Sequence, residues 1–206
     1  MYRAQFWGRG GGMKVRLLQG LTADQRTEAA ALYWRVFGAK LGRVMGPEAK
    51  AMAFIERVID PAHMIAAVDG RGHVLGVIGF RTAKGAFVGG DRADLRAVYG
   101  RFGAFWRGLA LQLLAQDLAQ GTLCVDGFAV TEPMRGRGVG AALIEALCAQ
   151  AQARGYRVLR LDVVHENLRA KALYDRLGFS VTGRADRWLT AAIFGYRTTV
   201  AMERPL

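Results

Sequence analysis

The sequence predicts a single α/β domain, built on a mixed sheet with helices on its faces. Two observations carry this prediction. Apolar residues follow helical and strand periods in the order helices, hairpin, helical insert and then β-α-β-α-β-β. One of the predicted strands also runs through a glycine-rich turn straight into a helix. With 206 residues, 52% of them hydrophobic, the chain is long enough to bury one full core.

The first half of the domain is predicted to hold two helices and a β-hairpin. Residues 22–37 carry apolar side chains at i, i+3 and i+4, and a second short helix follows Pro47. Residues 64–68 and 74–80 are β-rich runs separated by an Asp-Gly turn signal. We therefore expect these two runs to pair as neighbouring strands.

The second half alternates strands and helices. Its predicted elements are a helical insert at residues 91–120, weakened by Gly100, Gly103 and Gly108, strands at 122–130 and 156–164, helices at 139–153 and 167–177, and final strands at 179–182 and 196–202. The helix at 139–153 is well marked, because Arg154 and Gly155 form a basic last turn and a C′ glycine.

The N-terminal residues 1–12 are glycine-rich and lack the apolar core of a secretory signal. We expect them to form a flexible leader, with one domain over residues 13–206. Cys124 and Cys148 lie in apolar runs and are too few for a disulfide framework or a metal cluster. We therefore expect both cysteines to be reduced residues of the core. We also expect a cytoplasmic protein without a bound metal.

The chain is strongly basic, with 29 Lys and Arg against 17 Asp and Glu, a net charge of +12. Such an excess attracts nucleic acid, acidic membranes or anionic ligands. The basic residues are spread along the chain without a block of five, which disfavours a nucleic-acid-binding protein. No apolar run reaches the ~18 to 20 residues of a membrane span, so we expect no membrane partner.

The chemistry is concentrated in the segment from Val130 to Gly140. It leaves a strand, turns at Pro133 and enters a helix through alternate glycines. These glycines let successive N–H groups converge in front of the helix N-terminus, which is an anion site. Arg135 and Arg137 add charge-assisted donors. The segment therefore predicts a site for a cofactor that carries a pyrophosphate.

Two other phosphate loops fit less well. A Walker A loop is excluded, because no Gly-Lys-Ser or Gly-Lys-Thr follows the glycines. A dinucleotide fingerprint is formally present at Gly136, Gly138 and Ala141, with Asp162 further on. That fingerprint needs its first glycine almost directly after the strand, whereas residues 131–135 intervene here.

Two blocks resemble those of the GNAT superfamily of N-acetyltransferases. Residues 135–140, RGRGVG, resemble its RxxGxG/A cofactor loop, and residues 167–179, NLRAKALYDRLGF, resemble its NxxAxxLYxxxGF segment, one strand later. The likeness is strong over residues 122–182 and elsewhere rests on element order. It implies a GNAT-type fold, which is a mostly antiparallel twisted sheet of about seven strands with splayed central strands. It also implies acetyl-CoA as co-substrate.

The resemblance also assigns residues to the cofactor. The backbone of Phe128, Ala129 and Val130 would pair with the pantetheine, and the loop would bind the pyrophosphate through Arg135, Gly136, Arg137, Gly138, Val139 and Gly140. Asn167 would contact the cofactor, and Tyr174, two helical turns on and hence on the same face, would be the general acid. Without this resemblance, the sequence alone would make Asn167 a helix N-cap and Tyr174 an aromatic residue of the core.

A general base is needed to take the proton of the attacking amine. Asp126 is our first candidate, since strand alternation places it on the same side as Phe128 and Val130, although an ion pair with an arginine is an equal reading. Glu132 ranks second and His165 third. The backbone N–H of Val130 is our candidate oxyanion donor.

The resulting prediction is an enzyme that moves an acetyl group from acetyl-CoA to a primary amine, most simply a small molecule, by direct attack in a ternary complex. The alternatives are a non-catalytic acyl-CoA-binding module and a basic nucleic-acid-binding protein. The insert at residues 91–120 departs from the family pattern and carries Tyr99, Phe102, Phe105 and Trp106. It could wall the acceptor pocket, form a homodimer contact or cover the sheet.

Overall fold

The computed structural model describes residues 3–7, 14–112, 119–186 and 188–206. Its strands are β1 (Arg3–Trp7), β2 (Lys14–Leu18), β3 (Met64–Val68), β4 (Val74–Thr82), β5 (Gly85–Ala86), β6 (Thr122–Val130), β7 (Val158–Val164), β8 (Ser180–Asp186) and β9 (Thr198–Pro205). Its α-helices are α1 (Ala23–Met45), α2 (Glu48–Val58), α3 (Arg92–Gln112), α4 (Val139–Ala153), α5 (Leu168–Arg176) and α6 (Trp188–Phe194). Two short 3-10 helices are η1 (Pro61–His63) and η2 (Glu132–Met134).

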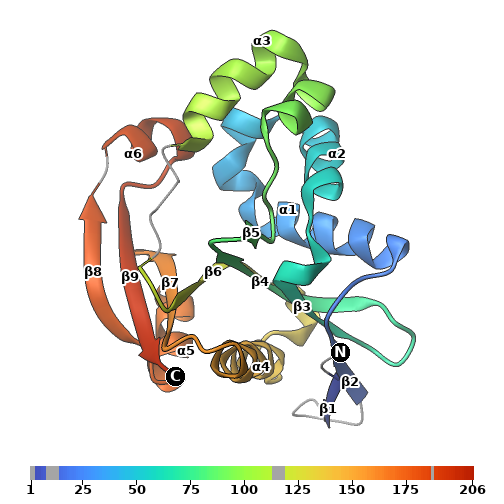
Figure 1. Ribbon diagram of the computed structural model, residues 1–206, viewed down its shortest axis with the longest axis vertical. Helices are drawn as coiled ribbons and strands as arrows, with labels where there is room; N and C mark the ends of the chain where they lie inside the picture. Colours follow the sequence, from blue (N-terminus) through green and yellow to red (C-terminus); the bar gives the residue numbers. More distant parts are fainter. Residues whose placement is uncertain (1–2, 8–13, 113–118, 187) are drawn as a thin grey trace.

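The strands form one mixed sheet in the order β1-β2-β3-β4-β6-β7-β9-β8, with β5 paired to β4 (Figure 1). In the described part of the chain, β6 and β7 are the one parallel pair and all other neighbours are antiparallel. The predicted mixed, mostly antiparallel sheet is therefore confirmed, with nine strands instead of about seven.

The two central strands separate along their length. β6 pairs with β4 as far as Val130, which lies opposite Gly76. Its pairing with β7 ends much earlier, at Cys124 opposite Arg160. Beyond Cys124, β6 therefore has no strand partner on its β7 side among the described residues. This fork is the predicted splay, and it leaves a strand edge with open backbone groups.

Helices cover the sheet on both faces (Figure 1). On one face α4 and α5 bury a core that includes Leu143, Leu147 and Tyr174. On the other face α1 and α2 bury a second core around Tyr33 and Phe87. The sheet is thus the middle layer of three, as the order of elements predicted.

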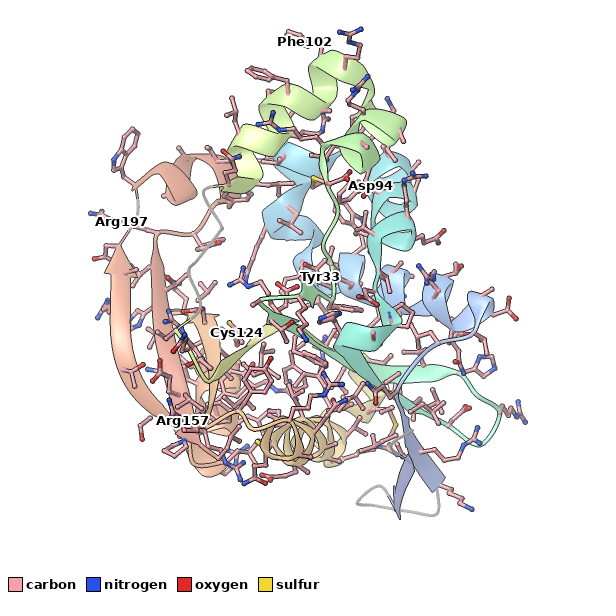
Figure 2. All side chains as sticks on the ribbon, viewed as in Figure 1. Tyr33, Asp94, Phe102, Cys124, Arg157 and Arg197 are labelled. Carbon is pink, nitrogen blue, oxygen red and sulfur yellow. The ribbon has the colours of Figure 1, made fainter. Side chains whose placement is uncertain are left out.

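The insert packs mainly against helices. Tyr99 donates a hydrogen bond from its hydroxyl to the carbonyl of Met45, 2.6 Å away, and Arg107 donates to the carbonyl of Gly46, 3.0 Å away. Gly100 breaks α3 with φ 70° and ψ 176°, as the weak glycine positions suggested. Phe102 lies near the middle of α3, at the top of the molecule in Figure 2, and is 86% exposed. Covering the sheet is therefore not the role of α3, and a homodimer contact stays a prediction. The predicted helical residues 113–118 lie outside the described part.

The N-terminal region differs from the prediction. Residues 3–7, expected within a flexible leader, form β1 and pair with β2 from Arg3 opposite Leu18 to Trp7 opposite Lys14. The glycine-rich stretch between these two runs was interpreted as a leader, although the same composition suits a strand connection. Sequence analysis also missed β2 and α6 and ended α1 too early.

Candidate active site

A cavity of about 860 Å³ opens at the fork where β6 separates from β7, and it is bounded by β6, α4 and α5. It is lined by β6, the glycine loop, the first turn of α4, the inner face of α5 and Val36 of α1. The predicted cofactor residues on its wall are Phe128, Ala129, Val130, Arg135, Gly136, Arg137, Gly138, Gly140 and Asn167. Three further predicted residues, Val139, Tyr174 and Asp126, are not part of this wall.

The glycine loop leaves the start of α4 open. Gly136 and Gly138 have φ of 79° and 88°, in the left-handed region that favours glycine. Gly138 is the N-cap, and no side chain caps the helix in the described structure. The N–H groups of Val139 and Gly140 therefore lack intrahelical partners. Val139 is 0% exposed and does not line the cavity, so Gly140 is the residue of this pair that reaches the cavity wall.

The helix start also approaches the strand closely. A Cβ added at Gly140 would lie 3.0 Å from Cζ of Phe128. This position therefore accepts only glycine without movement of a cavity side chain. The close contact brings the α4 N-terminus and the β6 edge onto one cavity wall.

Arg135 ties the loop to the end of β6. Its Nε donates to the carbonyl of Val130 at 3.3 Å, and its guanidinium pairs with the Glu132 carboxylate at 3.3 Å. The Glu132 side chain is 82% exposed on the turn. Glu132 is thus held beside the anion site, which agrees with its lower rank as a base candidate.

The edge of β6 presents alternate residues to the fork. Thr131 donates its backbone N–H to Leu75 of β4. Hydrogen bonding in an antiparallel pair alternates, so the backbone groups of Ala129 point to β4, while those of Phe128 and Val130 point into the fork. The contact from Arg135 to the Val130 carbonyl agrees with this pattern.

Two predicted residues lie on or near α5. Asn167 is its N-cap and accepts from the backbone N–H of Ala170 at 3.2 Å, so the capping reading is confirmed, and its side of the helix also meets the cavity. Tyr174 is buried in the core between Phe128 and Phe179, at ring distances of 6.3 and 5.7 Å. Burial raises the pKa of Tyr174, so its hydroxyl keeps its proton.

The hydroxyl of Tyr174 makes no hydrogen bond to a described residue. The packing of its ring therefore leaves the O–H group uncommitted among these residues, and a core role is compatible with a role as acid.

Asp126 does not lie where alternation placed it. In the pairing with β4, Gly127 lies opposite Gly79 and Val125 opposite Phe80, which leaves Asp126 as the extra residue of a β-bulge. The bulge turns its side chain to the α1 face, where the carboxylate accepts from the backbone N–H of Val88 at 3.4 Å. The prediction that it shares a face with Phe128 and Val130 was wrong, because a bulge shifts the alternation by one residue.

The surroundings of Asp126 favour its neutral form. Burial raises the pKa of this carboxyl, while Arg81 and the backbone N–H groups of Val88 and Phe87 partly oppose the shift. The Asp126 charge in turn contributes to the raised pKa of Tyr33 on α1. Asp126 and Tyr33 are therefore neighbours on the face of the sheet opposite the cavity.

His165 lies at the end of β7. Its backbone N–H donates to Thr198 at 3.0 Å, and its Nδ1 is enclosed without a hydrogen-bond partner in the described part of the chain. It is absent from the cavity wall. Its position gives no support to a role as base.

Sequence reasoning missed several cavity residues, above all Arg169 and Arg176 of α5. Their spacing with Leu173, at i, i+4 and i+7, is a one-face helical pattern that was visible in the sequence.

Cys124 and Cys148 are buried and free, as expected. Within the described residues no helix could cross a membrane, and no three His, Cys, Asp or Glu side chains gather to hold a metal.

The family model for the Acetyltransferase (GNAT) family matches residues 26–179. The chain belongs to this family. The match spans α1 to the end of α5 and so includes the fork, the glycine loop and the cavity wall. None of the curated proteins matches the sequence.

Solved structures share the fold. A GCN5-related N-acetyltransferase from Kribbella flavida is 20% identical with a TM-score of 0.62, covering 93% of this chain and 98% of its own. An agmatine N-acetyltransferase mutant is 14% identical with a TM-score of 0.60, covering 93% and 99%. The ribosomal-protein-S18-alanine N-acetyltransferase from Escherichia coli is 14% identical with a TM-score of 0.53, covering 93% of both chains. At these identities the likeness concerns the fold of this GNAT protein alone.

Proposed function

We propose that this GNAT protein transfers an acetyl group from acetyl-CoA to a primary amine, by direct attack in a ternary complex. The observation that carries the proposal is one cavity, which joins an open strand edge to an uncapped helix N-terminus. An extended amide-bearing chain suits the edge and a pyrophosphate suits the helix start. The pantetheine and diphosphate of coenzyme A supply these two groups in one molecule.

Residues on the cavity wall would hold the donor. The backbone groups of Phe128 that point into the fork would pair with the pantetheine amides, the N–H of Val130 would meet the thioester oxygen, and Ala129 would line the arm. The open N–H groups after Gly138, with Arg135 and Arg137, would bind the pyrophosphate. Asn167 would contact the arm from α5.

Three groups would carry the reaction. As the amine nitrogen bonds to the thioester carbon, the N–H of Val130 would donate to the developing oxyanion. Asp126 would accept the amine proton, directly or through water, from the α1 face. When the C–S bond breaks, the leaving thiolate would take its proton from Tyr174. The bulge supports this arrangement, because it places the base on the opposite face of β6 from the acid.

The alternatives are weaker. A non-catalytic acyl-CoA-binding module would need the cavity but neither Tyr174 nor Asp126. A nucleic-acid-binding protein would explain the basic charge as well, but the phosphates of coenzyme A already account for the four arginines that line the cavity. We favour a small-molecule amine over a protein N-terminus on family grounds, and a cytoplasmic location on the two free cysteines.

Calorimetric titration of acetyl-CoA tests the proposal, with Gly138→Asp as the loop variant and Gly155→Asp as its control. Both glycines have positive φ and open space around an added Cβ, but Gly155 follows the far end of α4. We expect micromolar binding by wild type and Gly155→Asp, and none by Gly138→Asp. A thiol-release screen of amines then follows. Absence of binding by the wild type would refute the proposal.

A further inference from the structure

The cavity wall carries more positive charge than a pyrophosphate needs. Four of its residues are arginines, Arg135 and Arg137 from the loop and Arg169 and Arg176 from α5, and none of its lining residues is acidic. A diphosphate diester brings about two negative charges. A phosphomonoester brings another −1.5 to −2 at about pH 7. Four guanidinium groups thus match a ligand that carries both groups.

The two α5 arginines lack partners among the residues that the structure describes. Arg135 is held by Glu132, whereas neither Arg169 nor Arg176 makes a hydrogen bond or ion pair with a described residue. Like charges that gather without acids repel one another, so an anionic ligand would relieve that repulsion. The helix dipole favours a basic residue in the last turn of a helix, which gives a reason for Arg176 at the end of α5. It gives no reason for Arg169, which lies in the first turn of α5.

Their placement separates them from the loop. Arg169 and Arg176 are seven residues apart, with Leu173 between them on the same face, and all three line the cavity. The loop arginines, Arg135 and Arg137, belong instead to the turn that precedes α4. The α5 pair is therefore free to bind a second phosphate while the loop holds the first.

We propose that Arg169 and Arg176 form a subsite for the 3′-phosphate of coenzyme A. This inference rests on the proposed function. It makes the protein selective for acyl donors that carry a phosphomonoester on the ribose. Donors that end at the diphosphate, such as acetyl-3′-dephospho-CoA, lose the charge that the α5 pair binds.

The test is the ratio of two dissociation constants, for acetyl-CoA and for acetyl-3′-dephospho-CoA, measured by calorimetry. Charged hydrogen bonds predict a ratio of roughly 10 to 100 for the wild type. In an Arg169→Gln, Arg176→Gln double variant the ratio falls close to 1, because acetyl-CoA weakens and the dephospho form does not. Lys171→Gln, on the same helix but off the cavity wall, keeps the wild-type ratio.

Two outcomes overturn the subsite. One is equal binding of both donors by the wild type, which leaves the acetyltransferase proposal intact. The other is a double variant that weakens both donors equally, which assigns the pair to the diphosphate. Binding of neither donor by the wild type refutes the proposed function instead. Both arginines are exposed, so the double variant is expected to fold, and its circular dichroism checks this.

Discussion

The Asp126 carboxylate accepts a hydrogen bond from the backbone N–H of Val88 across a β-bulge, on the face of the sheet opposite the Phe128 ring. This relationship separates the two halves of the candidate site. Phe128 faces α4 and α5, where the cavity lies, and Asp126 faces α1. An amine that enters from the α1 face would meet the carboxylate before it meets the thioester.

Replacement of Asp126 by asparagine should therefore slow acetyl transfer without weakening acetyl-CoA binding. General-base catalysis contributes roughly 10²- to 10⁴-fold, and we expect a kcat loss in this range. Because burial raises the pKa of Asp126, wild-type kcat should increase with pH through that raised value, and the variant should lose this limb. Thiol-release kinetics across pH measure both. An unchanged kcat in Asp126→Asn would assign the base elsewhere.

The same substitution should increase stability at neutral pH. A carboxyl whose pKa is raised in the folded state binds more protons there than in the unfolded chain. Its stabilising contribution is thus complete below the ordinary Asp value and is lost as pH rises through the raised pKa. Urea denaturation at about pH 4 and about pH 8 should show a stability difference between Asp126→Asn and wild type that grows with pH. A difference that shrinks would contradict the burial of a charged group.

Two substitutions of Tyr174 should distinguish the packing role of its ring from the catalytic role of its hydroxyl. Tyr174→Phe keeps the ring that lies between Phe128 and Phe179, so stability and acetyl-CoA affinity should stay near wild type while kcat falls. Tyr174→Ala empties a buried site and should cost about 3–5 kcal/mol of unfolding free energy. Thermal denaturation and thiol-release assays distinguish the two. Full activity in Tyr174→Phe would leave the hydroxyl without a catalytic role.

Local sequence signals predicted the bounds of the elements that line the cavity well. The bounds of α4 agree with the predicted 139–153, because a glycine N-cap at its start and Arg154 with Gly155 after its last residue mark its ends in the sequence. The strand at 122–130 was likewise right. These features depend on neighbouring residues alone, through capping, turn chemistry and period-two alternation.

The α1 face of the sheet depended on contacts that the sequence does not display. The bulge at Asp126 arises from its register against β4, since two residues of one strand meet one of the other. The packing of α3 against α1 and α2 rests on contacts such as Tyr99 with Met45, 54 positions apart. Pairing of β1 with β2 is also decided by partners, and a glycine-rich stretch alone could not reveal it.

The insert should be anchored by the Tyr99 hydroxyl, which donates to the buried carbonyl of Met45 at 2.6 Å. Tyr99→Phe leaves that carbonyl without this donor and should cost about 1–3 kcal/mol. Tyr156→Phe is the control, because the Tyr156 hydroxyl has no hydrogen bond to a described residue. Chemical denaturation compares the two. Equal losses in both variants would show that the hydrogen bond contributes nothing specific.

The close approach of α4 to β6 gives a last prediction. It compares two helical glycines, one at which an added Cβ would meet a side chain and one at which it would meet open space. Alanine in place of a helical glycine usually stabilises by about 1 kcal/mol. Gly42 of α1 has open space around an added Cβ, so Gly42→Ala should show this gain and leave acetyl-CoA binding unchanged. At Gly140 the added Cβ would lie 3.0 Å from Cζ of Phe128, so Gly140→Ala should lose the gain by displacing that ring, and should weaken acetyl-CoA binding because Phe128 lines the cavity. Denaturation and calorimetry on both variants measure this. If Gly140→Ala gained as much stability as Gly42→Ala and kept full affinity, the close approach of α4 to β6 would not shape the donor cavity.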